Sequence, residues 1–147
     1  MSREETGVVI QLFKEHVPEI AAGDVVIVAL ARIEGVRTKV AVQAKVPAID
    51  AVRACCGKSG SRIRELAKRL GRERLDLLRW DDCVETLIGR ALQPALVQEV
   101  ILHPAQHRAT VVVGKSQVQH ARGKNGENLQ LTSQLTGWQI NIAVAKE

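Results

Sequence analysis

Gly57-Lys58-Ser59-Gly60 is the stretch on which the fold depends, and it returns 66 residues later as Gly123-Lys124-Asn125-Gly126. Both copies are Gly-x-x-Gly loops with a lysine between the glycines. Glycine lacks a Cβ atom, so it permits positive φ values and a close approach of the backbone to a ligand. Because lysine is a common phosphate-binding residue, we expect the ligand at these loops to carry phosphate.

A helical segment follows each loop. After the first loop, apolar residues recur at the i, i+3, i+4, i+7 spacing of an amphipathic helix: Ile63, Leu66, Ala67 and Leu70. Gly71 then occupies the position of a helix C-terminal glycine. After the second loop we expect a helix over residues 127–136, ended by Gly137. Both loops therefore precede a helix N-terminus, whose free N–H groups favour phosphate.

Two strands are expected before the first loop. Residues 25–33 are rich in β-branched side chains, Glu34-Gly35 is a turn signal, and residues 36–46 alternate in polarity. Arg37 and Lys39 fall on the side opposite the valines. We therefore expect a hairpin with one solvated face.

The predicted elements occur twice in the order helix, strand, strand, helix, loop, helix, strand. In the first half the remaining elements are a helix over 4–15, a short helix capped by Asp50, and a strand over 75–80. The second half has a helix capped by Asp81 or Asp82, strands over 97–102 and 108–113, a short helix over 116–121, and a strand over 138–144. This pattern predicts an α+β chain of two domains, residues 1–80 and 81–147. No low-complexity linker separates them, so we expect them to be held at a fixed angle.

The composition narrows the class of partner. The 147 residues carry a net charge of +5 and a pI of about 9.4, which favours a polyanionic partner. One Phe, two Trp and no Tyr are too few for a sheet that stacks bases on aromatic side chains. If the polyanionic partner is RNA, it must therefore be held by backbone, aliphatic side chains and cations.

The sequence offers little for catalysis, metal binding or membrane insertion. Three cysteines without a Cys-x-x-Cys pair predict neither a disulfide framework nor a zinc site. His103 and His107 are four residues apart, but Pro104 and strand-like neighbours argue against a metal-binding helix there. We expect no enzyme activity and no cofactor. No apolar run approaches the ~20 residues that span a bilayer, and no signal-peptide pattern is present, so we expect a cytoplasmic protein without membrane contact.

These motifs resemble a known family. A helix–Gly-x-x-Gly–helix segment beside a three-stranded sheet is the signature of the KH domain, and the order of elements found here is that of the prokaryotic, type II, form. Several further runs are similar to the tandem KH region of the bacterial NusA family of transcription termination and antitermination factors: Val17-Pro18-Glu19-Ile20, Gly35-Val36-Arg37-Thr38-Lys39, Leu78-Arg79-Trp80, Ala91-Leu92 with Pro94-Ala95, and Leu135-Thr136-Gly137-Trp138. The resemblance implies two type II KH domains, each a three-stranded sheet with helices packed on one face.

The resemblance also implies a binding site for about four unpaired nucleotides beside each loop. With the neighbouring cations, the RNA-binding residues expected in the first domain are Arg53, Cys56, Gly57, Lys58, Ser59, Gly60, Arg62 and Ile63. In the second domain they are Arg122, Gly123, Lys124, Asn125, Gly126 and Leu129. Further apolar groove positions implied by the family are Val52, Cys55, Val118 and Ala121.

Arg122 departs from the family pattern, which has isoleucine at that position. It either adds a cation and a guanidinium stacking surface or spoils the apolar groove. Charge is also uneven, because basic residues crowd the first loop and its helix whereas the second helix carries mostly uncharged polar residues. We therefore expect the first domain to supply most of the attraction for phosphate.

The function implied is NusA-like: a monomer that binds single-stranded RNA and holds the nascent transcript during elongation, termination and antitermination. The RNA polymerase elongation complex is the implied setting. The alternative is a KH-fold module that docks on a protein of the transcription or translation machinery, a use that the polar second helix and Arg122 would suit.

Overall fold

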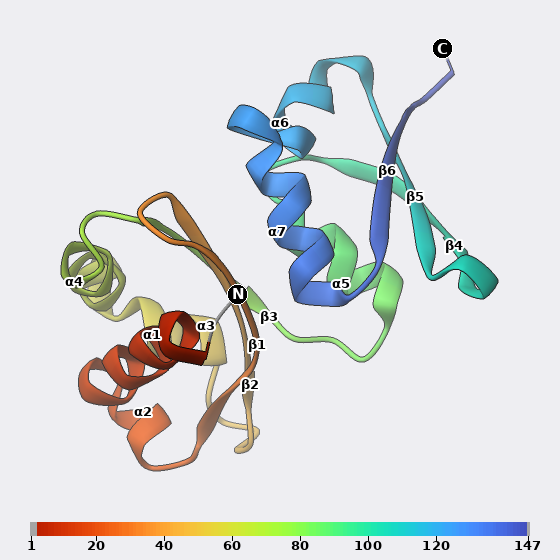
Figure 1. Cartoon of the computed structure of the whole chain (residues 1–147). Helices are drawn as coiled ribbons and strands as arrows, with labels where there is room; N and C mark the ends of the chain where they lie inside the picture. Colours follow the sequence, from red (N-terminus) through yellow and green to blue (C-terminus); the bar gives the residue numbers. More distant parts are fainter. Residues whose placement is uncertain (1–2, 147) are drawn as a thin grey trace. The chain divides into compact units, whose positions relative to one another are not determined.

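The computed structural model describes residues 3–146, with side chains from residue 6 onward. The chain divides after Trp80 into two compact units, each of which is described by itself. Both units share the order helix, strand, strand, helix, Gly-x-x-Gly turn, helix, strand and the same kind of sheet, although the first unit begins with two helices and the second with one (Figure 1).

The first unit begins with two helices and places its loop between two more. Its elements are α1 (Arg3–His16), α2 (Pro18–Ala21), β1 (Val25–Ile33), β2 (Arg37–Ala44), α3 (Ala51–Cys56), the 3₁₀ turn η1 (Lys58–Gly60), α4 (Ser61–Arg69) and β3 (Arg74–Arg79). Strand β2 is central, antiparallel to β1 and parallel to β3. The core is built from the helices and the inward side of β2, with Phe13 of α1, Leu66 of α4 and Val40 of β2 fully buried.

The second unit repeats this plan. Its elements are α5 (Val84–Ala91), β4 (Val97–His103), η2 (Pro104–Gln106), β5 (Arg108–Val113), η3 (Lys115–Gln117), α6 (Val118–Arg122), η4 (Lys124–Gly126), α7 (Glu127–Thr136) and β6 (Gln139–Val144). Strand β5 is central, antiparallel to β4 and parallel to β6. Ile88 of α5, Ala121 of α6 and Val111 of β5 form part of its core. The predicted α+β class, with helices on one face of a three-stranded sheet in each unit, is confirmed (Figure 1).

Local signals at helix ends are only partly as predicted. Asp50 caps α3 as expected, because its Oδ1 accepts a hydrogen bond from the Arg53 N–H at 3.1 Å. Pro18 begins α2, since proline suits the first turn of a helix. Neither Asp81 nor Asp82 is the cap of α5: the N-cap is Cys83, whose own N–H donates to Asp81 Oδ1 at 2.8 Å.

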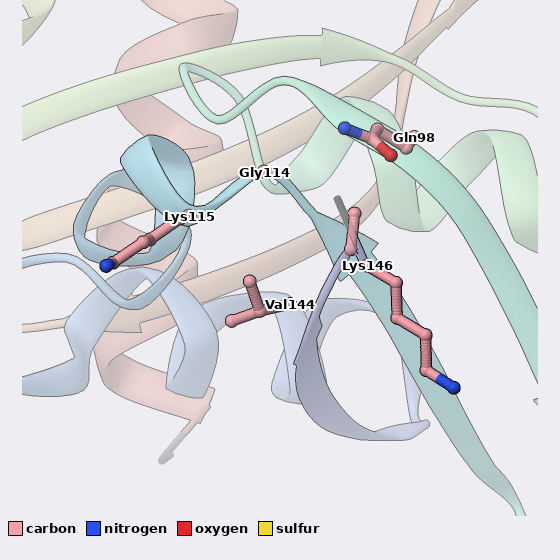
Figure 2. A pocket seen from close by; sticks show the side chains of 6 residues that line it. Gln98, Gly114, Lys115, Val144 and Lys146 are labelled. Atoms are coloured by element: carbon pink, nitrogen blue, oxygen red, sulfur yellow. The ribbon is translucent and has the colours of Figure 1, made fainter.

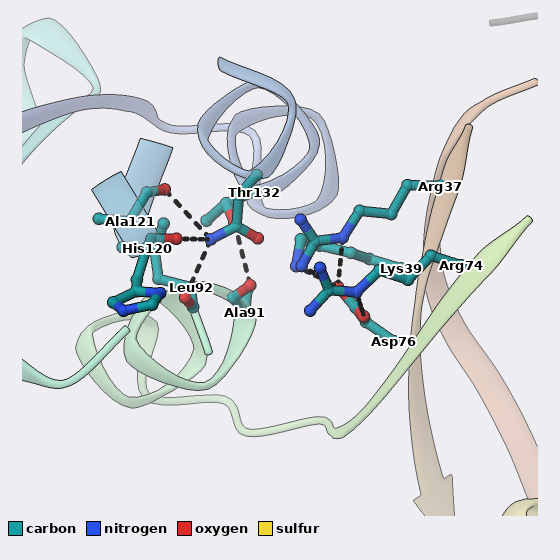
Figure 3. Close-up of polar contacts among 10 residues, drawn as sticks. Arg37, Lys39, Arg74, Asp76, Ala91, Leu92, His120, Ala121 and Thr132 are labelled. Atoms are coloured by element: carbon teal, nitrogen blue, oxygen red, sulfur yellow. Dashed lines mark hydrogen bonds and ion pairs between the residues drawn. The ribbon is translucent and has the colours of Figure 1, made fainter. Parts of the chain in front are cut away.

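The expectation of a solvated face on the first hairpin is wrong. Arg37 and Lys39 are almost fully buried, and Arg37 Nε and Lys39 Nζ each lie 2.7 Å from Asp76 Oδ2 on the parallel strand β3 (Figure 3). Burial lowers the pKa of Lys39 to about 8, although the Asp76 carboxylate acts in the opposite direction. Polar and apolar side chains do alternate along β2, but its charged side chains are buried in an ion-pair cluster with Asp76 and do not face solvent.

A second buried ion pair joins the β1–β2 turn to the start of β3. Glu73 accepts hydrogen bonds from Arg32 Nη2 at 2.6 Å, from Thr38 Oγ1 at 2.8 Å and from the Gly35 N–H at 2.8 Å. Burial acts to raise the pKa of Glu73, yet these donors hold it below its ordinary value. Glu73 thus fixes the chain where the turn and the third strand meet.

Candidate nucleic-acid interface

The two Gly-x-x-Gly loops have the same backbone conformation. The first glycines, Gly57 and Gly123, have φ, ψ values of 73°, 174° and 75°, 173°. The last glycines, Gly60 and Gly126, lie in the left-handed region at 76°, 16° and 74°, 13°. The third residue of each loop, Ser59 and Asn125, is also left-handed, at 55°, 28° and 57°, 23°. The two loops therefore share one backbone geometry.

The first glycine of each loop is required by close packing as well as by its backbone angles. A Cβ atom on Gly57 would lie 2.6 Å from Arg62 Cγ, and one on Gly123 would lie 2.8 Å from the backbone nitrogen of Asn128. Both partners occupy the second position of the helix that follows the loop. The turn therefore folds directly back onto the start of this helix.

Arg62 and Asn128 occupy equivalent positions, five residues after the first glycine, and both connect this helix to the helix before the loop. Arg62 Nη1 donates to the carbonyl of Ala54 at 2.7 Å and to Glu19 Oε1 at 2.8 Å. Asn128 Nδ2 donates to the carbonyls of His120 at 3.2 Å and Ala121 at 3.1 Å (Figure 3). Different side chains thus hold the two loops in the same shape.

Asn128 makes a further contact with the first helix of its unit. Its Nδ2 also lies 3.0 Å from the carbonyl oxygen of Leu92, and Thr132 Oγ1 donates to the carbonyl of Ala91 at 3.2 Å (Figure 3). Both carbonyls are at the C-terminal end of α5, where helix carbonyls lack partners within the helix. These buried contacts fix α7, and with it the second loop, against α5.

We expect Gly123→Ala to destabilise the chain more than Gly126→Ala. Ala at position 123 would have to adopt a conformation that only glycine adopts readily, and its Cβ would clash with the Asn128 backbone. The free energy of unfolding should therefore fall by about 3 kcal/mol. A Cβ at Gly126 meets no atom within 4 Å, so only the left-handed strain of about 1–2 kcal/mol remains. Urea unfolding followed by circular dichroism measures both values. Equal losses of unfolding free energy in the two variants would show that the close approach at Gly123 adds no cost of its own.

The two central residues of each loop face solvent. Lys58 and Ser59 of the first loop are exposed, as are Lys124 and Asn125 of the second. Helices α4 and α7 begin immediately after the last glycine of their loop. Each site therefore offers an accessible lysine next to the N-terminus of a helix, an arrangement that can bind an anionic phosphate.

The remaining residues predicted for the site differ in their exposure. Arg53 and Arg122 are exposed, whereas Cys56, Ile63 and Leu129 are half-buried. Ile63 lies beside the first loop, because its Cγ2 is 3.8 Å from the position of a Cβ on Gly60. Arg62 lies in the first turn of α4, next to the loop, but its guanidinium already donates hydrogen bonds to Glu19 and to the carbonyl of Ala54.

Two groove positions implied by the family are interior instead. Cys55 and Ala121 have no exposed surface and belong to the cores of their units. Burial raises the pKa of the Cys55 thiol to about 12, with a smaller contribution from the neighbouring Cys56, whose own pKa is raised by burial. Both thiols are therefore protonated at neutral pH. Val52 and Val118 are half-buried and also pack against these cores.

The roles of Arg62 and Asn128 in holding the loops were missed by reasoning from the sequence. Arg62 was grouped with the phosphate-binding cations because its charge is visible in the sequence, and Asn128 had no evident signal. Their shared place in the two copies, the second residue of each helix, was the available clue. Which carbonyl each side chain would reach depended on the tertiary structure.

An open hollow of about 620 Å³ lies elsewhere on the second unit, at the ends of β5 and β6. It is lined by Gln98, Gly114, Lys115, Val144, Ala145 and Lys146. No residue of a Gly-x-x-Gly loop lines it, and the side chains of Lys115 and Lys146 extend in different directions (Figure 2). The lysines do not converge on one anion, so this hollow does not add a phosphate site to those at the two loops.

The histidines singled out in the sequence have structural partners. The ring of His107 stacks on Trp138 with centroids 4.2 Å apart, and its Nδ1 lies 2.8 Å from the carbonyl oxygen of Gly137. His103 Nε2 lies 3.0 Å from Thr110 Oγ1. Among the described residues, no group of three or more His, Cys, Asp or Glu side chains could hold a metal ion. Over the same part of the chain, no helix combines the length and apolar character needed to cross a bilayer.

Models of two protein families match the chain in succession. The model described as "NusA-like first KH domain" matches residues 3–80, and the one described as "NusA-like second KH domain" matches residues 84–147. Together they cover both loops and all of the sheet strands described above.

Curated relatives of similar sequence carry the name "Transcription termination/antitermination protein NusA". The protein from Thermus thermophilus is 40% identical over 146 residues, which is 99% of this chain and 38% of the relative. The proteins from Mycobacterium bovis and Mycobacterium tuberculosis are 41% identical over 143 residues, which is 97% of this chain and 41% of each relative. The chain thus spans about two fifths of the length of these relatives.

A solved structure of the same fold is titled "Crystal structure of APE1850". It aligns with a TM-score of 0.63 over 93% of this chain and 95% of that chain, at 16% sequence identity. At this identity the likeness shows the fold alone.

Proposed function

The chain belongs to the family of NusA-like KH domains, and from this membership we propose that it binds single-stranded RNA at its two Gly-x-x-Gly loops. KH domains clamp the backbone of about four unpaired nucleotides with such a loop. The observation that carries the proposal is the identical backbone of two solvent-facing loops, each with an accessible lysine at the start of a helix.

The apolar residues near the first loop support a single-stranded ligand. Unpaired bases can be turned away from the phosphate chain and laid on side chains, which the bases of a duplex cannot. Ile63 lies against the first loop and remains half-exposed, as does Cys56 directly before it. The chain has few aromatic residues, so the bases would rest on aliphatic and sulfur-containing side chains.

The two loops are proposed to differ in strength. The first has Lys58 together with the exposed cation Arg53, and the second has Lys124 and Arg122. Arg122 replaces an apolar groove residue of the family, so its guanidinium would stack on a base rather than pack in an apolar channel. Because Arg64 and Lys68 are exposed on α4 where α7 has Gln130 and Gln134, we assign the stronger site to the first unit.

The biological setting follows from the names of the relatives. These are transcription termination and antitermination proteins, so we propose that this chain holds nascent RNA during transcription elongation, termination and antitermination. A single chain carries both loops, so the proposal requires only a monomer. Binding of short unpaired RNAs, compared with duplexes of the same sequence by fluorescence anisotropy, tests this function. Equal affinity for both would contradict it.

RNA binding should depend on salt concentration. If about five phosphates are contacted, the logarithm of the association constant should fall with the logarithm of salt concentration with a slope of roughly −3.5, because each neutralised phosphate of a single strand contributes about −0.7. Anisotropy titrations from 50 to 300 mM salt, about the range in which such slopes are measured, give this value directly. A slope near zero would show that phosphate contacts do not drive binding.

A further inference from the structure

The exposed side of helix α4 carries positive charge beyond the first loop. Arg64 and Lys68 are one helical turn apart and both are exposed, and Arg72 is exposed just after the helix ends. An α-helix rises 1.5 Å per residue, so Lys68 lies about 10 Å along the axis from Ser61 at the helix start. A phosphate at Lys68 would therefore be a different one from the phosphate at the loop.

Arg64 connects this charged surface to the loop. Its Nη1 donates to the carbonyl oxygen of Ser59 at 2.6 Å and lies 3.0 Å from the position of a Cβ on Gly60. A guanidinium group has five N–H donors, so this contact leaves others directed away from Ser59. The loop carbonyl thus positions a cation immediately beside the predicted phosphate site.

The acidic side chains near this surface are already paired. Glu65 accepts a hydrogen bond from Arg69 Nε at 3.0 Å, and Glu19 pairs with Arg62 at 2.8 Å. Glu73 is buried with Arg32. Glu65 also interacts electrostatically with Lys68. Since Glu65 is a single carboxylate already paired with Arg69, Arg64, Lys68 and Arg72 still give this surface a net positive charge.

The second unit lacks this surface although its helix is equivalent. The residues 66 positions after Arg64 and Lys68 are Gln130 and Gln134, and both are exposed on α7. The same fold and loop therefore occur in this chain with and without the extra cations, which makes the second unit an internal control.

We propose that Arg64, Lys68 and Arg72 form a flanking phosphate track, which binds the RNA backbone beyond the nucleotides held at the first loop. This proposal rests on the proposed function and extends it by giving the first unit a longer binding site. Charge complementarity and continuity with the loop through Arg64 identify the occupant as a phosphodiester chain. RNA longer than the few nucleotides of one KH site should bind more tightly for this reason.

The double variant Lys68→Gln/Arg72→Asn tests the track without touching the loop. Asn tolerates the left-handed conformation of Arg72, whose φ is 67°. Loss of two phosphate contacts should make the salt slope shallower by about 1.4 with a single-stranded decamer. We expect affinity for the decamer to fall about tenfold and affinity for a pentamer, measured by competition, to change less than about twofold.

The reciprocal variant Gln130→Arg/Gln134→Lys places matching cations on α7. It should steepen the salt slope with the decamer, since it adds two positions for phosphate contact. An unchanged slope for the Lys68→Gln/Arg72→Asn variant, with wild-type binding intact, would overturn the track and leave the proposed function standing. Failure of the wild-type chain to bind either RNA would instead overturn the proposed function.

Discussion

Replacing Lys58 and Ser59 together by Asp is expected to remove most RNA binding while leaving the fold intact. The two side chains are exposed, and Asp is among the residues that tolerate the left-handed conformation of Ser59. Two carboxylates would then face the phosphate chain at its closest approach to the backbone. Like charges at an interface cost several kcal/mol, so affinity should fall about 100-fold or more.

Anisotropy with a single-stranded decamer measures this loss, and urea unfolding checks that stability is retained. The matched control is Lys124→Asp/Asn125→Asp in the second loop, which has the same backbone but no cations equivalent to Arg64 and Lys68. We expect a smaller loss there. If the Lys58→Asp/Ser59→Asp variant binds RNA as the wild type does, the alternative function, a module that docks on another protein, is favoured.

Replacing Glu73 by Ala is expected to lower the free energy of unfolding by about 3–5 kcal/mol, the usual range for removing one partner of a buried ion pair. Arg32 would remain in the interior without its carboxylate, and Thr38 and the Gly35 N–H would lose an acceptor. Urea unfolding at pH 7 measures the loss. Glu65→Ala is the control, because its ion pair with Arg69 is exposed and should contribute little.

The effect of Glu73 should also depend on pH. The pKa of Glu73 is lowered in the folded chain, so its stabilising contribution is present above the ordinary value near 4.5 and is lost as the pH falls through the folded value. The Glu73→Ala variant should therefore lose less stability on acidification than the wild type. A stability difference that is the same at pH 7 and at about pH 3 would argue against a charged Glu73.

Much of the local structure could be predicted from the sequence because its causes are local. The strand over Val25–Ile33 and the helix over Glu127–Thr136 were predicted with the bounds that the structure has. Side-chain periodicity and glycine at turns act within a few residues, so they can be read without knowing the fold. The repeat of the Gly-x-x-Gly loop also indicated that one unit had been built twice.

The identity of the buried residues was harder to predict. Lys39 was expected to face solvent but is buried, and its Nζ pairs with the half-buried Asp76, which lies 37 positions away in the sequence. Cys55 was assigned to a groove and belongs to the core. A charged or small residue on an amphipathic element does not reveal which distant element covers it.

The sequence by itself determined the element order of each unit, the glycine loops and the excess of positive charge on α4. Only the tertiary structure decided which cations remain accessible to a ligand. Arg62 is hydrogen-bonded to Glu19 and to the carbonyl of Ala54, whereas Arg64 is hydrogen-bonded to the loop carbonyl of Ser59 and Lys68 is exposed. The physical reason is that charge is a property of each residue, but pairing and burial depend on contacts between elements that the chain brings together only on folding.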